Sequence, residues 1–146
     1  MSQYTAIRNF VNTVLGEYVV IPRNRLDNNF SMGLKYAQPR LYLPRNLNYE
    51  MDENDKAFRK DFVSRYSTAQ GFANITITLL HECGHWATKD QGDMMTYGER
   101  AAKARNMKEY LLIKEERLAT DWAIQWLYEP ANRKIAKAFE KEYFKK

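Results

Sequence analysis

The sequence predicts an α+β fold, a helix-rich domain with a small sheet, and three observations lead to this prediction. Apolar residues recur at helical spacing through most of the chain. The two runs that indicate strands both lie in the first third, where three of the four prolines also fall. The length of 146 residues fits one core, so 1–146 is expected to form a single domain. Strands and helices segregated along a chain are typical of α+β proteins.

Five segments show helical periodicity. In chain order they are 4–15, 52–66, 69–87, 110–128 and 131–144. Ser67 or Thr68 is the expected cap of the third helix, which is apolar on most sides and therefore expected to be buried. A polar stretch, 89–96, follows it, and Pro130 is expected to end the fourth helix.

Two runs in the first third indicate strands. Residues 18–21 form a short run with β-branched side chains that stops at Pro22. Residues 34–43 contain Pro39 and are followed by Pro44, which favours an edge strand or two short pieces. Of the second run, 40–43 is the better strand.

Composition and charge narrow the function classes. The net charge of +5 suggests nucleic-acid binding, but the basic residues are scattered among acidic ones, so a nucleic-acid partner is not expected. No apolar run approaches the roughly 20 residues of a membrane span. The first ten residues lack the pattern of a signal peptide, and a single cysteine excludes an internal disulfide. These features together favour a cytoplasmic protein.

The strongest chemical signal is the segment His81-Glu82-Cys83-Gly84-His85. On a helix, His81 and His85 share one face, so both imidazoles can reach a single ion, and neutral imidazoles suit Zn²⁺. Glu82 is rotated by about 100° around the helix, beside the ion without binding it. From there its carboxylate can take a proton from a zinc-bound water. The chain has only two histidines, and both lie in this segment.

A zinc site of this kind needs a third protein ligand and one open position. Cys83 points to the wrong face and is expected to pack in the core. In the helix expected over 110–128, the small residues Ala119 and Ala123 would allow close approach to the histidine helix. Glu116 precedes Ala119 by three residues, which places it on that face and makes it the leading candidate. Two rivals, Glu115 and Asp121, remain open.

The two segments, 81–85 and 116–123, together resemble the gluzincin metallopeptidases, most closely ImmA/IrrE-type and minigluzincin domains. The resemblance covers about 34–130. It implies a zincin-like domain in which the HExxH helix packs on a helix carrying a glutamate ligand. It also implies a strand that lines the substrate cleft, for which 40–44 is expected. Where this family often has an acidic or amide residue after the alanine, this chain has Thr120, so Asp121 is a candidate partner for a ligand histidine.

These observations lead us to expect a zinc metallopeptidase acting on a protein or peptide, with Glu82 activating the zinc-bound water. The electrophile that stabilises the oxyanion stays open among Tyr97, Tyr110, Arg100 and Arg117. The alternative is a metal-containing but non-catalytic module that sequesters a partner protein. Glu82 favours catalysis, because a purely structural metal site needs no acid at that position.

Overall fold

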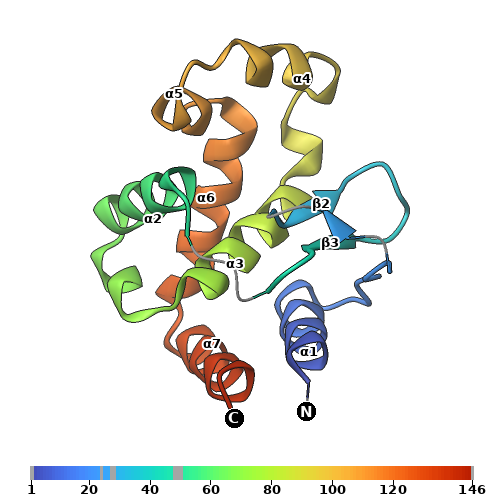
Figure 1. The fold of residues 1–146 in the computed structure, drawn as a ribbon, viewed down its shortest axis with the longest axis vertical. Helices are drawn as coiled ribbons and strands as arrows, with labels where there is room; N and C mark the ends of the chain where they lie inside the picture. Colours follow the sequence, from blue (N-terminus) through green and yellow to red (C-terminus); the bar gives the residue numbers. More distant parts are fainter. Residues whose placement is uncertain (1, 24, 27–28, 48–50, 146) are drawn as a thin grey trace.

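The computed structural model describes residues 2–23, 25–26, 29–47 and 51–145 (Figure 1). Helices dominate this part of the chain, and a small sheet comes from its first third, so the predicted helix-rich α+β fold is confirmed. The helices are α1 (Gln3–Leu15), α2 (Glu53–Arg65), α3 (Asn74–Ala87), α4 (Met94–Lys103), α5 (Met107–Leu111), α6 (Lys114–Tyr128) and α7 (Pro130–Tyr143). The strands are β1 (Arg25–Leu26), β2 (Ser31–Gly33) and β3 (Arg40–Pro44), and two 3₁₀ turns span Ser67–Gly71 and Lys89–Gln91.

The sheet has the order β1-β3-β2, with β3 parallel to β1 and antiparallel to β2. β3 is therefore the central strand, which confirms the expected strand over 40–43, whereas the alternative of an edge strand was wrong. The reason is the placement of the two prolines, since Pro39 lies before the strand and Pro44 is its last residue. The expected strand over 18–21 is reduced to one bridge between Val20 and Arg40.

Helix α3 lies between α6 and the sheet, in contact with both α6 and β2 (Figure 1). It begins at Asn74, five residues later than predicted, because Ser67–Gly71 forms a separate 3₁₀ turn. Its N-cap residue, Ala73, has no capping side chain. Glu140 of α7 replaces it: one carboxylate oxygen accepts from the Ala73 amide at 2.7 Å and from the Thr76 hydroxyl at 2.5 Å. The cap expected from Ser67 or Thr68 was wrong.

The single helix expected over 110–128 is two helices, α5 and α6, separated at 112–113. Before them, part of the polar stretch and the residues that follow form α4, which was not predicted and buries none of its residues. Both α4 and α5 lie at the end of the molecule opposite the two chain termini (Figure 1). Polar contacts, described below, hold α4 to α6.

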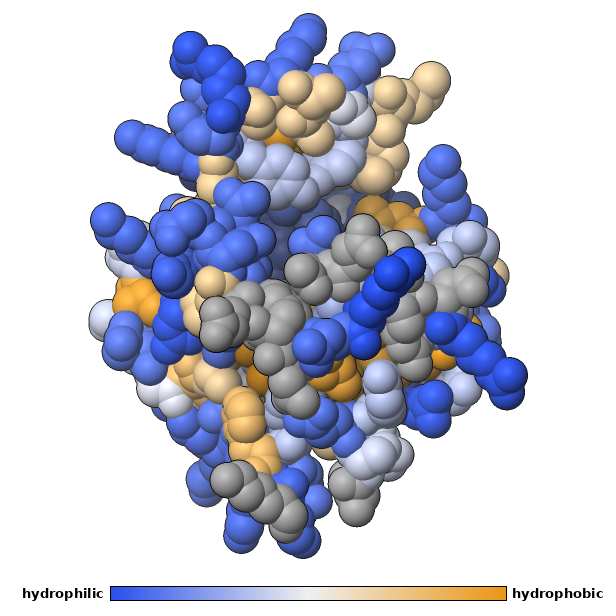
Figure 2. All heavy atoms as spheres, viewed as in Figure 1, coloured by the Kyte–Doolittle hydropathy of each residue, from blue (hydrophilic) through white to orange (hydrophobic). Residues whose placement is uncertain are grey.

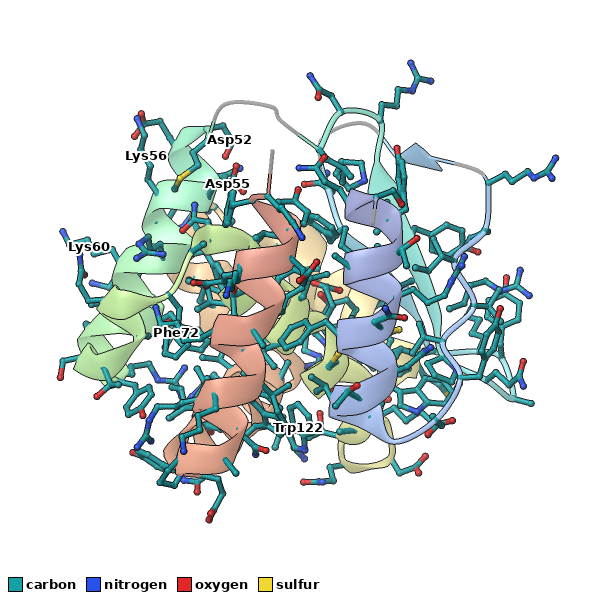
Figure 3. All side chains as sticks on the ribbon, turned by 90° about the horizontal axis from the view of Figure 1, so that it is seen from below. Asp52, Asp55, Lys56, Lys60, Phe72 and Trp122 are labelled. Carbon is teal, nitrogen blue, oxygen red and sulfur yellow. The ribbon has the colours of Figure 1, made fainter. Side chains whose placement is uncertain are left out.

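The hydrophobic core lies beneath α3, where α1 and α7 run side by side (Figures 1 and 3). The rings of Phe10 and Phe139 stack across these two helices with centroids 4.4 Å apart. Cys83 is fully buried in the same core, as predicted. Of the helices described, none has both the length and the apolar character needed to cross a bilayer.

Candidate metal centre

The site is built on an unusually close contact between α3 and α6. A Cβ atom placed on Gly84 would lie 2.9 Å from the Cα atom of Ala119, closer than packed carbon atoms approach. Ala119 and Ala123 are both fully buried at this contact, as their spacing predicted. The small side chains on the two helices bring the backbone of α6 within reach of the histidines of α3.

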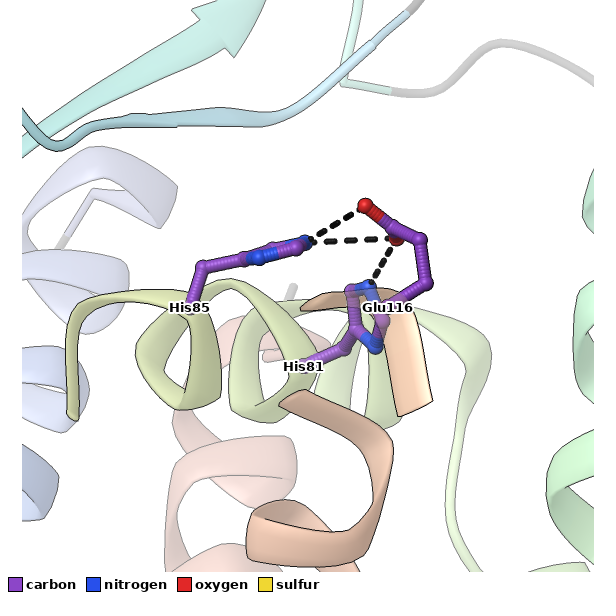
Figure 4. Close-up of side chains that lie close together, drawn as sticks. All are labelled: His81, His85 and Glu116. Carbon is purple, nitrogen blue, oxygen red and sulfur yellow. Dashed lines mark hydrogen bonds and ion pairs between the residues drawn. The ribbon is translucent and has the colours of Figure 1, made fainter. Parts of the chain in front are cut away.

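Three side chains converge where the helices meet (Figure 4). His81 Nε2 lies 2.9 Å from Glu116 Oε1, and His85 Nε2 lies 3.3 Å from Oε1 and 3.2 Å from Oε2 of the same carboxylate. One ligand atom from each of the three residues falls within 4.8 Å of the others. His81 and Glu116 are buried, and His85 is half-buried. The structure thus brings together the three residues predicted as metal ligands.

The carboxylate and the imidazoles shift one another's protonation. Burial alone would raise the pKa of Glu116, but hydrogen bonds from His81 and His85 outweigh it and hold this pKa well below its usual range. Burial alone would lower the pKa of His85, but the hydrogen bond to Glu116 and the charges of Glu82 and Glu116 raise it. Glu116 is therefore a carboxylate at neutral pH, the form that binds a metal.

A further ring of contacts orients these groups. Thr120 Oγ1 lies 2.9 Å from Nδ1 of His81 and can accept its hydrogen, which would leave Nε2 to bind a metal ion in place of its hydrogen bond to Glu116. The Tyr97 hydroxyl donates to Glu116 Oε2 at 2.5 Å, and it lies 2.8 Å from the Tyr110 hydroxyl. Burial and the negative charge of Glu116 raise the pKa of both tyrosines, so both stay protonated.

Glu82 stands beside the three ligands without belonging to their group. Its Oε1 atom accepts a hydrogen bond from the backbone amide of Met32, in β2, at 3.0 Å. Burial is the main reason that the pKa of Glu82 is raised, and the nearby histidines oppose this rise only in part. The strand beside Glu82 is therefore β2. Of the expected strand 40–44, Tyr42 lines the groove, so the expectation is confirmed for this residue, while β2 makes the direct contact with Glu82.

The rival ligands lie elsewhere. The Glu115 carboxylate is held by the Arg100 guanidinium, at 2.7 Å and 2.9 Å, and by the Asp93 amide. Asp121 is exposed and pairs with Arg65, so it is not the partner of a histidine either. Among the four candidate electrophiles, only the two tyrosines contact the site. Arg100 is occupied by Glu115, and Arg117 is exposed on α6.

A groove passes in front of the three ligands and Glu82. It has two cavities, of about 450 Å³ and about 370 Å³, within the range of known ligand sites. Five residues line both cavities and form the junction between them: Phe30, Ser31, Glu82, Tyr110 and Glu116. Figure 2 shows this face hollowed beneath the end that carries α4 and α5. The cleft was predicted between the sheet edge and the metal site, and the groove lies there.

Sequence reasoning missed three residues that shape the site. Met32 lies in a three-residue strand with no sequence pattern, and its backbone amide rather than its side chain makes the contact. Gly84 was quoted as part of the motif, but its close contact needs the position of α6. Thr120 follows Glu116 by four residues, so helical spacing alone could have placed both on one face.

The residues present fit a metal ion. Two imidazole nitrogens and a carboxylate oxygen face one point, and without a proton or a cation between them their lone pairs would repel. The chain matches no family model, no curated protein and no solved structure. The arrangement of these side chains therefore carries the functional argument, and the likeness to gluzincins still rests on two motif segments.

Proposed function

We propose that the protein is a zinc-dependent peptidase in which Glu82 is the general base and acid. One observation carries the proposal: α3 and α6 gather two histidines and a carboxylate, while Glu82, a fourth group with a raised pKa, faces the same groove. A structural metal site has no use for this fourth group. Hydrolysis of a peptide bond requires it, since a proton must be taken from water and delivered to the leaving amine.

The ligands of the ion would be the Nε2 atoms of His81 and His85 and the carboxylate of Glu116. Three protein ligands of these types with a position left open are typical of catalytic zinc. When bound, Zn²⁺ supplies a Lewis acid that polarises the scissile carbonyl and lowers the pKa of water. The hydrogen bond from His81 Nδ1 to Thr120 and the one from Tyr97 to Glu116 would hold His81 and Glu116 in the orientations that binding needs.

Glu82 would move the proton. As the oxygen of water bonds to the carbonyl carbon, one proton passes to the Glu82 carboxylate, and Glu82 then gives it to the amine nitrogen as the C–N bond breaks. The amide of Met32 occupies Oε1, which leaves Oε2 free for this transfer. The raised pKa of Glu82 brings it nearer to neutral pH, where a group that both accepts and donates a proton works best.

Tyr110 is the electrophile that the groove favours. It lines both cavities, whereas the Tyr97 hydroxyl donates to Glu116. Because Tyr97 has one hydrogen and gives it to Glu116, Tyr110 must be the donor in the contact between the two hydroxyls. Tyr110 would exchange that bond for one to the substrate carbonyl oxygen as negative charge develops there.

The test combines metal content with peptide cleavage. Wild type should hold about one zinc per chain, and His85→Ala and Glu116→Ala should lose it. Asp121→Asn, which removes an exposed carboxylate of the same helix, is the matched control and should keep it. Glu82→Gln should keep zinc and lose about 10²–10⁴-fold in cleavage rate. Absence of zinc from wild type would overturn the metal centre.

The variant Glu82→Gln also separates catalysis from the alternative function, a module that only sequesters a partner protein. If Glu82→Gln cleaves as fast as wild type, Glu82 is not the base and the peptidase assignment fails. A sequestering module would show zinc in wild type and in Glu82→Gln, equal partner binding by both, and no cleavage by either.

A further inference from the structure

The two cavities that meet at Glu82 and Glu116 differ in their chemistry. We call the smaller one the aromatic lobe. Its walls beyond the shared residues come from β2, the turn that follows it, β3 and α4, and the residues that the argument uses are Gly33, Leu34, Tyr36, Tyr42 and Met94. We call the larger one the α2 lobe. It is lined by the start of α2 with Asp52 and Asp55, and also by Phe58.

The aromatic lobe has a preformed wall. The Tyr36 ring lies over Gly33, where its Cε2 atom would be 3.1 Å from a Cβ, so any larger residue would force the ring to shift by a few tenths of an ångström. The Arg40 guanidinium lies 4.1 Å from the centre of the same ring. Two neighbouring groups therefore hold Tyr36 in place before any ligand enters.

This wall leaves apolar surface uncovered. Tyr36 and Met94 are 45% and 44% exposed, and both line the lobe. Tyr42, on β3, is half-buried and contributes a second aromatic ring. A large apolar side chain placed among these three would remove its own surface and theirs from water, which favours binding in proportion to the area covered.

The α2 lobe offers a different surface. Asp52 is the N-cap of α2 and Asp55 lies in its first turn (Figure 3), and each carboxylate accepts a hydrogen bond from the other residue's backbone amide. These two carboxylates line the α2 lobe and are absent from the lining of the aromatic lobe. The two lobes therefore offer different surfaces to a peptide that lies across them.

We propose that the aromatic lobe is the specificity pocket of the peptidase, and that it takes a large apolar side chain, such as that of phenylalanine or leucine, from the residue beside the scissile bond. This inference rests on the proposed function, because it places the scissile bond at Glu82 and Glu116, where the two lobes meet. The substrate is then an extended peptide segment with a bulky apolar residue next to the cleaved bond.

The experiment uses the zinc-loaded protein and a set of decapeptides made of glycine, serine and alanine. One central position is occupied in turn by Phe, Leu, Lys, Asp or Gly, and mass spectrometry locates the cleaved bond. We expect cleavage next to Phe or Leu, with kcat/KM about 10–100-fold above that of the Gly peptide. Glu82→Gln, which should not cleave, is used to measure binding of the same peptides.

Two pairs of variants test the assignment of the lobe. Met94→Ala and Tyr36→Ala should each reduce the preference for Phe over Gly by about 3–10-fold. Met95→Ala and Tyr18→Ala are the matched controls, because Met95 and Tyr18 are exposed by 94% and 57% and neither is among the lining residues of the lobe. The controls should keep the wild-type preference.

The outcomes separate this inference from the peptidase proposal. Cleavage with no apolar preference, or with a preference that Met94→Ala and Tyr36→Ala leave intact, overturns the aromatic lobe as the specificity pocket and leaves the peptidase standing. Absence of cleavage, with Glu82→Gln still binding the Phe peptide more tightly than the Gly peptide through Met94 and Tyr36, overturns the peptidase alone. Neither cleavage nor selective binding overturns both.

Discussion

Thr120 of α6 reaches across to α3 and places its hydroxyl oxygen 2.9 Å from Nδ1 of His81. Thr120→Val keeps the shape of this fully buried side chain but removes the hydrogen-bonding oxygen, so His81 loses the contact that orients its ring. We expect zinc affinity to fall by about 10–100-fold, measured by competition with a chelator. Thr120→Ser keeps the oxygen and should stay near wild type. Equal affinity in the Val variant would contradict this role.

The close contact at Gly84 gives a second prediction. Gly84→Ala forces a Cβ against the backbone of Ala119, and overpacking of this kind costs about 1–3 kcal/mol of unfolding free energy. Because the helices must separate, zinc affinity should fall as well. Gly98→Ala is the control, since a Cβ at Gly98 in α4 meets no atom within 4 Å, and it should stabilise by about 0.4–1 kcal/mol. Urea unfolding measures the unfolding free energy of both variants, and a Gly84→Ala protein as stable as wild type would contradict the prediction.

Because Glu140 caps the start of α3, we expect its loss to destabilise the fold at a point away from the candidate metal site. Glu140→Ala leaves the Ala73 amide and the Thr76 hydroxyl without their shared acceptor. Loss of a helix cap costs about 0.5–2 kcal/mol, which should appear as a lower urea midpoint with an unchanged slope. Glu140→Gln retains an oxygen acceptor and should lose less. A Gln variant as unstable as the Ala variant would mean that packing, not capping, is responsible.

Glu115 predicts a dependence of stability on pH. Hydrogen bonds from Arg100, together with the one from the Asp93 amide, lower the pKa of Glu115 from 4.5 to about 2. Burial opposes this shift but is the weaker effect. A depressed pKa stabilises the fold above the unfolded-state pKa, and this contribution is lost as pH falls from about 4.5 to about 2. Glu115→Gln should therefore cost about 1–2 kcal/mol at pH 7, since Arg100 is partly exposed, and almost nothing at pH 2.

This measurement uses metal-free protein, so that zinc release at low pH does not contribute. The quantity to follow is the difference in unfolding free energy between wild type and Glu115→Gln. A difference that stays constant from pH 7 to pH 2 would show that the contact between Arg100 and Glu115 contributes through packing rather than through charge.

The grouping of the three candidate ligands was predictable in large part because helical spacing decides which side chains share a face. His81 and His85 share a face whatever the rest of the chain does, and Glu116 shares a face with Ala119, which marks the closest approach of the two helices. The features that the sequence did not indicate depend on distant parts of the chain. The start of α3 is set by Glu140, more than sixty residues away, in competition with nearby polar residues that look like caps.

Two elements around the groove escaped prediction for a related reason. The strand β2 has three residues, too few for alternation to show. Helix α4 buries no side chain, so its place depends on Tyr97 and Arg100, three residues apart, which bind the neighbouring residues Glu116 and Glu115 of α6. Hydrophobic periodicity does not detect a helix held by polar contacts alone.

The three metal-ligand candidates come from α3 and α6 alone, whereas the groove in front of them is walled by β2, its following turn, α2, α4 and α5. Mutations can therefore accumulate in the β2–β3 turn without touching the residues that would perform the chemistry. A lineage, or a protein engineer, could exchange the β2–β3 turn and so obtain new peptide preferences on an unchanged pair of helices. The close contact of Gly84 with Ala119 would be the part that such diversification must preserve.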